Sequence, residues 1–295
     1  MQRIGWLAVA LLPATLVAQQ EAGTELWRLA ATTIPAPPAL ARGAVAVLWN
    51  PAQPLPAHAA VAVDAIETPA TIGASGVLAV ARVRAAGGAL GFVYGRMELG
   101  DLVRTTVSPD PAGGAIPFYT ETAGVTYAHG TGATIVGASA LVHDTKIDGQ
   151  RASRVTFDVG VARALGPVLR LAAATHFFSS LSTTHAAQEV YAGVELRVWH
   201  GPLWGAQHAR FDASYGLTFA RGSSADHYLG GRLSFDDRLA AELVLVREQS
   251  YCCAALRGTA GIDLGIGRYR LRLARDTGAE NLGSAFRVGI EARLQ

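Results

Sequence analysis

The first group of residues that could do chemistry contains serine and histidine. Its members are His176, Ser179, Ser180 and His185. A histidine can remove the proton of a serine hydroxyl that attacks a carbonyl, but this reaction also needs an orienting third group and an oxyanion pocket. The sequence contains no GxSxG motif, and Ser, Thr and His are ordinary in polar loops. We therefore predict that the protein is not an enzyme.

A second group carries the oxygen and imidazole ligands that a divalent cation uses. Its members are His143, Asp144, Asp148 and Glu280. Their spacing does not match an EF-hand loop, so we interpret them as solvated loop residues. Cys252 and Cys253 are adjacent and lack the spacing of a zinc site. The sequence thus predicts no metal site and no cofactor.

Composition excludes one class of partner. The chain has 295 residues, of which 50% are hydrophobic and 16% charged, and its formal net charge is +2. No run rich in Lys and Arg provides a local basic patch, so we expect no nucleic-acid binding.

The N-terminus reads as an export signal over residues 1–18. Arg3 supplies the positive start, and Ile4 to Ala18 form an apolar run that is too short for a membrane span. No later segment has the roughly 18 predominantly apolar residues of a spanning helix. We therefore expect the mature protein to leave the cytoplasm.

Charged and apolar residues alternate in the segment ARFDASYGLTFA, residues 209–220. Phe211, Tyr215 and Phe219 fall on one face of a two-residue repeat, and Asp212 falls on the other. The same alternation recurs through the chain, whereas the three- and four-residue steps of an amphipathic helix are scarce. This pattern predicts an all-β, antiparallel protein.

About fourteen strands follow from this repeat, with ends uncertain by about two to four residues. They are residues 60–66, 76–85, 89–99, 120–129, 133–143, 153–163, 168–178, 188–199, 208–220, 227–236, 239–249, 257–266, 268–275 and 285–294.

Tight and long connections take turns along the chain. Tight ones include AAGG (85–88) and HGTG (129–132), and long ones include residues 100–119 and 143–153. HGPLWGAQ (200–207) is an exception, because it is a longer connection at a tight position. Short turns at one rim and long loops at the other are typical of outer-membrane barrels. We predict a closed, up-and-down transmembrane β-barrel over residues 59–295.

The two faces of each strand then have different surroundings. The apolar face is expected to contact outer-membrane lipid, because charged groups on that face are costly. The polar face is expected to line the lumen. Its candidates are Arg154, Asp158, Glu195, Arg197, Asp212, Asp263, Arg287, Glu291 and Arg293. The alternative is a secreted, soluble β-sandwich binding protein, in which a second sheet would bury the apolar face.

Residues 19–58 precede the first strand and are rich in proline and small residues. Pro51 disfavours a helical conformation at Asn50, whose side chain can bond to nearby backbone, and Trp49 can anchor the stretch. We expect a short N-terminal plug or periplasmic segment with Trp49, Asn50 and Pro51 as hatch candidates. A rigid turn into the first strand is the alternative.

The string Trp49-Asn50-Pro51-Ala52 resembles an Asn-Pro-Ala element of the FadL/PorV superfamily of outer-membrane barrels. The phrase SRVTFDVGVARALGPVLRLAAAT (153–175) is similar to a strand–turn–strand unit of that family. The resemblance implies a fourteen-stranded barrel in the bacterial outer membrane. It also implies either a conduit for small or hydrophobic solutes, or a PorV-like component of type IX secretion or surface attachment that binds an exported partner protein.

Overall fold

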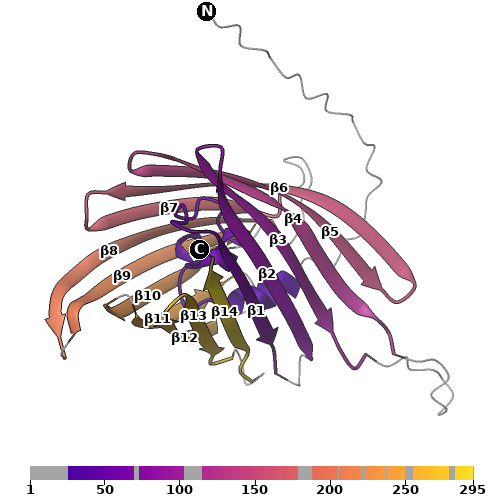
Figure 1. Ribbon diagram of the computed structural model, residues 1–295. Helices are drawn as coiled ribbons and strands as arrows, with labels where there is room; N and C mark the ends of the chain where they lie inside the picture. Colours follow the sequence, from indigo (N-terminus) through magenta and orange to yellow (C-terminus); the bar gives the residue numbers. More distant parts are fainter. Residues whose placement is uncertain are drawn as a thin grey trace, which may run out of the picture.

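The computed structural model describes residues 26–69, 73–102, 115–178, 188–204, 206–220, 224–236, 238–249, 255–278 and 283–294, except the side chains of residues 206 and 207. These residues form fourteen strands in one closed barrel, in which each strand pairs antiparallel with its neighbours in sequence and β1 pairs with β14. Figure 1 shows the strands running side by side in chain order.

The strands are β1 (Ala60–Glu67), β2 (Ala74–Ala85), β3 (Gly88–Leu99), β4 (Phe118–Thr131), β5 (Thr134–Ile147), β6 (Gln150–Leu165), β7 (Leu169–His176), β8 (Glu189–Leu203), β9 (Ala206–Ala220), β10 (Asp226–Phe235), β11 (Leu239–Glu248), β12 (Ala255–Ile266), β13 (Tyr269–Asp276) and β14 (Phe286–Arg293). The fold class predicted from the sequence is confirmed, since every predicted strand overlaps an observed one. The β-sandwich alternative is wrong, because the strands close on themselves instead of stacking as two sheets.

The strands turn their apolar faces outward. On β9, Phe211, Tyr215 and Phe219 are 37%, 40% and 44% exposed, whereas Asp212 is 4% exposed. The same inversion occurs on β6, where Val159 is 59% exposed and Asp158 is 1% exposed. The barrel therefore presents a broad apolar outer surface and encloses its charged residues.

Strand β11 carries charged residues on both faces, and it pairs with β10 and β12 without a β-bulge. Glu242, Val244 and Val246 share the inward face. Val244 and Val246 pack against Tyr228 of β10 in a small apolar cluster, while Glu242 pairs with Arg232. The inward face of this strand is thus part apolar and part charged.

Two connections expected to be long are wrong. Residues 143–153 are mostly strand, because β5 and β6 meet in a turn at Asp148 and Gly149, where Asp148 has a φ of 54°. Asp-Gly is a strong signal for a tight hairpin. HGPLWGAQ is also wrong as a long connection, because β8 continues to Leu203 and β9 begins at Ala206 through register shifts that absorb the extra residues.

The N-terminal segment folds inside the barrel. We call residues 26–58 the plug; it contains the α-helix α1 (Leu26–Thr32) and the 3-10 helices η1 (Pro38–Leu40) and η2 (Ala44–Leu48). The helix η1 contacts β7, β8 and β9, whereas η2 contacts β1, β2 and β3. The short helices therefore reach wall strands on both sides. No helix in the described part of the chain is long and apolar enough to cross a membrane.

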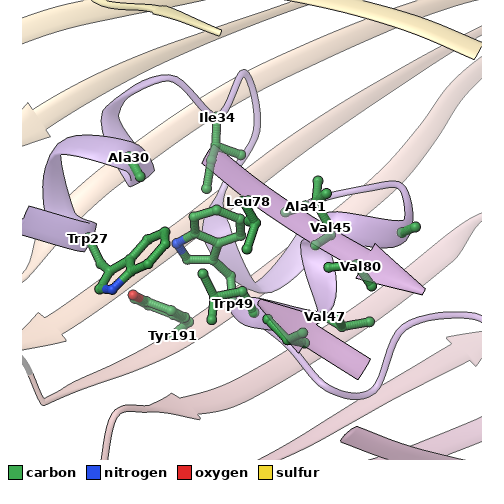
Figure 2. Packing of buried hydrophobic residues seen from close by; sticks show 14 of the residues in the cluster. Trp27, Ala30, Ile34, Ala41, Val45, Val47, Trp49, Leu78, Val80 and Tyr191 are labelled. Atoms are coloured by element: carbon green, nitrogen blue, oxygen red, sulfur yellow. The ribbon is translucent and has the colours of Figure 1, made fainter. Parts of the chain in front are cut away.

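An apolar cluster joins the plug to the wall. Trp27, Trp49 and Leu40 of the plug are each 1% exposed, and they belong to one cluster with Leu78 of β2 and Tyr191 of β8. Figure 2 shows both tryptophans in this cluster near Tyr191. The core of the protein therefore lies between the plug and the inner face of the barrel.

Candidate functional site in the barrel interior

The hatch candidate Asn50 is fully buried and fixes the plug's own backbone. Its side-chain amide donates to the carbonyl of Ala39 at 2.8 Å, and its side-chain oxygen accepts from the backbone N–H of Ala52 at 2.9 Å. The wall makes room for this bend with glycine: a Cβ at Gly160 of β6 would lie 2.3 Å from the Asn50 side-chain oxygen. A Cβ at Gly137 of β5 would lie 2.4 Å from the carbonyl carbon of Pro51. Asn50 and Pro51 therefore fit a close contact between plug and wall.

Trp49 lies next to an arginine that joins three parts of the chain. The guanidinium of Arg287, on β14, is 4.9 Å from the centre of the Trp49 ring. Arg287 also donates to the carbonyl of Ala30 in α1 at 2.8 Å and lies 3.7 Å from a carboxylate oxygen of Asp64 on β1. A cation over an aromatic face is attracted by the ring quadrupole. Arg287 thus ties two parts of the plug, α1 and Trp49, to the β1–β14 seam.

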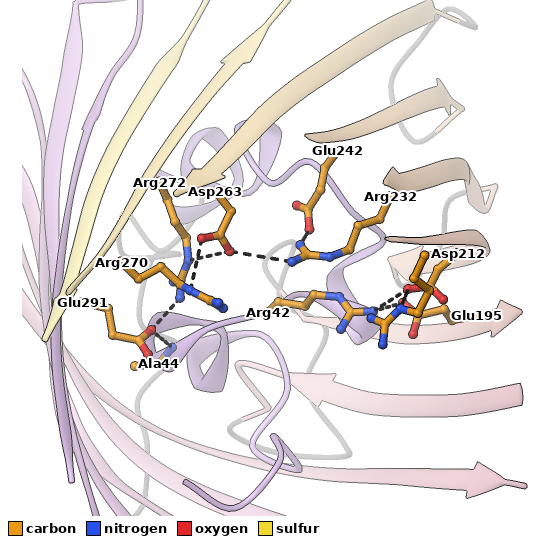
Figure 3. A network of polar contacts seen from close by, with 11 residues as sticks. Arg42, Ala44, Glu195, Asp212, Arg232, Glu242, Asp263, Arg270, Arg272 and Glu291 are labelled. Atoms are coloured by element: carbon orange, nitrogen blue, oxygen red, sulfur yellow. Dashed lines mark hydrogen bonds and ion pairs between the residues drawn. The ribbon is translucent and has the colours of Figure 1, made fainter. Parts of the chain in front are cut away.

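Ion pairs form the second set of contacts between plug and wall (Figure 3). Arg42 of the plug pairs with Glu195 of β8, and Asp212 of β9 lies 3.9 Å from the same guanidinium. On the other side, Glu291 of β14 accepts from the backbone N–H of Ala44 at 3.0 Å and pairs with Arg272 of β13 at 2.5 Å. Charged wall residues therefore hold both ends of the stretch from Arg42 to Ala44.

A network of charges continues along the wall between β10 and β13. Asp263 of β12 lies 3.2 Å from Arg270, 3.8 Å from Arg272 and 3.8 Å from Arg232. Arg232 also pairs with Glu242 on the neighbouring strand. Buried charges of this kind need partners, because an unpaired buried ion is costly.

The helix α1 contacts the wall at the end of the lumen that lies away from Arg42 and Ala44. Thr32 accepts from Arg257 at 3.0 Å and from Thr259 at 2.7 Å. Arg28 pairs with Glu189 at 2.6 Å, and Glu189 accepts from the hydroxyl of Tyr191 at 2.6 Å. The plug is therefore attached to the wall near both ends of the barrel.

The predicted lumen residues fall into three groups according to what their side chains contact. Glu195, Asp212, Arg287 and Glu291 contact or approach the plug, as described above. Asp158 accepts from the N–H of Phe178 at 3.2 Å and Arg154 donates to the carbonyl of Phe177 at 2.8 Å, so both hold the chain where β7 ends. Arg197 lies 3.9 Å from Asp212, Asp263 belongs to the charge network, and Arg293 is exposed where β14 ends.

The sequence did not lead us to predict several of the charged residues that lie in the interior. They are Arg28, Arg42, Asp64, Arg232, Glu242, Arg257, Arg270 and Arg272. Some carried a usable signal, since Arg270 and Arg272 alternate with Leu271 and Leu273. The two arginines of the plug carried none, because no pattern in residues 26–58 shows which wall residues they meet.

Among the described members of the predicted cation-ligand group, His143 and Asp144 do not come together. His143 is buried between Thr122 and Thr156, each hydroxyl lying 2.7 Å from one ring nitrogen. Asp144 points to the other face of β5 and pairs with Arg151 at 2.5 Å. Residues 179–187 and 279–282 and the adjacent cysteines lie outside the described residues, as do residues 1–18.

No protein-family model matches the chain, and a search of curated proteins also gives no match. Among solved structures, the toluene transporter TbuX of Ralstonia pickettii gives a TM-score of 0.55 at 13% identity over 86% of this chain and 96% of that protein. The outer membrane protein Omp33 of Acinetobacter baumannii gives a TM-score of 0.49 at 10% identity over 80% of this chain and 98% of that protein. The chain thus has the fold of an outer-membrane β-barrel.

Proposed function

We propose that the protein is an outer-membrane conduit for small or hydrophobic solutes, and that the plug controls passage through it. The observation that carries this proposal is a closed barrel whose outer surface is apolar while a separate segment of the chain fills its interior. A broad exposed apolar surface is favourable against lipid and unfavourable in water.

The proposed orientation follows from the connections. We call the end of the barrel with the tight turns, such as Ala86–Gly87 and Gly267–Arg268, the turn rim. Short turns face the periplasm in outer-membrane barrels, and long loops face outward. The turn rim is therefore assigned to the periplasm, and residues 1–18 to the signal that brings the chain there.

The class of solute is supported by the packing and by the fold. The plug meets the wall partly through Trp27, Leu40 and Trp49, so a plug that moves away from the wall exposes apolar surface to the lumen. The similarity in fold to a toluene transporter agrees with passage of a hydrophobic solute. The charged lumen candidates would then hold the plug in its closed position and line the path.

A disulfide between plug and wall tests this proposal. A Cβ at Gly193 of β8 would lie 3.6 Å from the Cβ of Ala39, which is within the range of disulfides. The variant Ala39→Cys/Gly193→Cys is made in a Cys252→Ser/Cys253→Ser background and reconstituted in liposomes. Gly193 also approaches Leu40, so bond formation is first verified by mass spectrometry.

Toluene crosses lipid unaided, so uptake is measured as the rate in excess of protein-free liposomes. We expect the oxidised variant to lose this excess and the reduced variant to recover it. The matched control, Val142→Cys/Val155→Cys, joins opposed positions on the outer face of β5 and β6 and does not touch the plug. Equal uptake by the oxidised and reduced forms would contradict control by the plug. A wild-type rate equal to that of protein-free liposomes would contradict the conduit itself.

A second candidate is a PorV-like component of secretion or surface attachment, which the Trp49-Asn50-Pro51-Ala52 string favours. In that case an exported protein would bind the outer loops. Co-purification of a specific exported protein, together with a barrel that is silent in planar bilayers, would favour this function over the conduit.

A further inference from the structure

A cavity of about 330 Å³ opens where the plug runs into the first strand at the turn rim. The plug contributes Gly43, Ala44 and the residues from Gln53 to His58, and the wall contributes Arg82 of β2 together with Glu291 and Arg293 of β14. An engineered cavity of about 150 Å³ holds benzene. The cavity therefore has room for a benzene-sized body that bears a polar group.

Arg82 gives this cavity a buried positive charge. The residue is 6% exposed, and its printed hydrogen bond is a long one of 3.5 Å to the carbonyl of Gln53. Within the described residues no acidic side chain lies within ion-pair distance of it, although Glu291 in the same lining attracts it. Because a buried arginine usually has a close ion-pair partner, this guanidinium has the properties of a binding group.

Two further donors surround the same cavity. Gln53 is 1% exposed, and its amide nitrogen is buried without a hydrogen-bond partner in the part of the chain that the structure describes. Arg293 is exposed at the mouth and forms no ion pair with the described acidic residues. Buried donors without an acceptor are uncommon in native proteins.

The acid in the lining is already engaged. Glu291 pairs with Arg272 at 2.5 Å and accepts from the N–H of Ala44 at 3.0 Å, as Figure 3 shows. The negative charge of Glu291 is therefore largely balanced by Arg272, which is not part of the lining. Donors outnumber acceptors in the cavity, which favours an anionic ligand.

Apart from His58, the remaining lining is apolar and includes Leu55, Pro56 and Ala60. Ligand sites commonly combine an apolar wall with a few polar groups that fix orientation. We propose that this cavity binds a small organic carboxylate, whose oxygens accept from Arg82 and Gln53 and whose body packs against the apolar residues. As a step in uptake the site rests on the proposed conduit, whereas as a binding site it does not.

Binding of benzoate to the full-length protein in detergent, measured by isothermal titration calorimetry, tests the proposal. We expect Arg82→Gln to weaken binding at least tenfold and Arg293→Gln to weaken it about threefold, because Arg293 is exposed and its charge is screened. The matched control is Arg84→Gln, which lies two residues along the same strand and outside the cavity. This control should bind benzoate like the wild type.

Two other probes separate charge from shape. Benzyl alcohol has a similar body without the charge, and inorganic phosphate has the charge without the body; each should bind at least tenfold more weakly than benzoate. Arg293→Gln keeps the test valid if Arg82→Gln does not fold. The proposal is overturned if the wild type does not bind benzoate, if both cavity variants bind it normally, or if either probe equals benzoate. Benzoate binding without toluene uptake would leave the site intact and remove only the conduit.

Discussion

The clearest perturbation of the plug is Asn50→Ala. The substitution removes two hydrogen bonds, which leaves the carbonyl of Ala39 and the N–H of Ala52 buried without those partners. An unsatisfied buried group costs about 1–3 kcal/mol, so the loss amounts to about 2–6 kcal/mol. Since about 1.4 kcal/mol is a factor of ten, the displaced state of the plug should become at least roughly 30-fold more populated.

Hydrogen exchange and planar-bilayer recordings measure this shift. Amides of η1 and η2 (Pro38–Leu40 and Ala44–Leu48) should lose protection by at least roughly 30-fold while the strands keep theirs. The open probability in the bilayer should rise with the loss of protection. The control is Thr32→Val, which removes only a local bond from the Thr32 hydroxyl to the carbonyl of Leu29 at 2.8 Å.

The reasoning would be refuted by an Asn50→Ala protein whose η1 and η2 amides exchange like those of the wild type. It would also fail if Thr32→Val opened the barrel as strongly, because the local bond does not span the bend at Asn50. A rise in exchange throughout the barrel would mean that Asn50 stabilises the whole fold rather than the plug's position.

Two further perturbations follow from the structure. Arg257→Met removes the pair with Glu248 at 2.5 Å and a bond to the carbonyl of Thr32. The free energy of unfolding in urea should therefore fall by about 3 kcal/mol, whereas the exposed control Arg247→Met should change it little. Equal urea midpoints for the two variants would contradict this. Val159→Arg places a charge on the outer face near the middle of β6, which should cost about 2–4 kcal/mol in a bilayer and reduce the heat-modifiable folded form. Undiminished folding into liposomes would argue against lipid contact at that position.

The barrel was predictable because its signal is local. A strand with lipid on one side and a polar interior on the other repeats every two residues, so segments such as residues 209–220 and 153–163 reveal both their extent and their faces. The two wrong connections failed for local reasons as well. The Asp148-Gly149 turn lies within a polar stretch that resembles a loop. The register shifts in β8 interrupt the alternation of apolar and polar residues, so the strand continues beyond the point where that pattern ends.

The interior was less predictable because its contacts are distant in sequence. Arg42 pairs with Glu195, and Ala44 donates to Glu291, across separations that no periodic pattern encodes. Trp49 and Asn50 were singled out through a short motif, which gave no sign of their partners. The cavity beside Arg82 depends on three separate segments meeting, so sequence alone gives no sign of it.

The contact of the outer face with lipid underlies the whole account, and spin labels along β9 test it most directly. Labels are placed singly at Phe211, Asp212, Tyr215, Thr218 and Phe219 in the liposome-reconstituted protein, and collisions with oxygen and with a water-soluble nickel complex are compared. We predict high oxygen accessibility at Phe211, Tyr215 and Phe219 and low oxygen accessibility at the other two positions. Equal accessibility at all five positions, or preferential contact of the aromatic positions with the nickel complex, would contradict it.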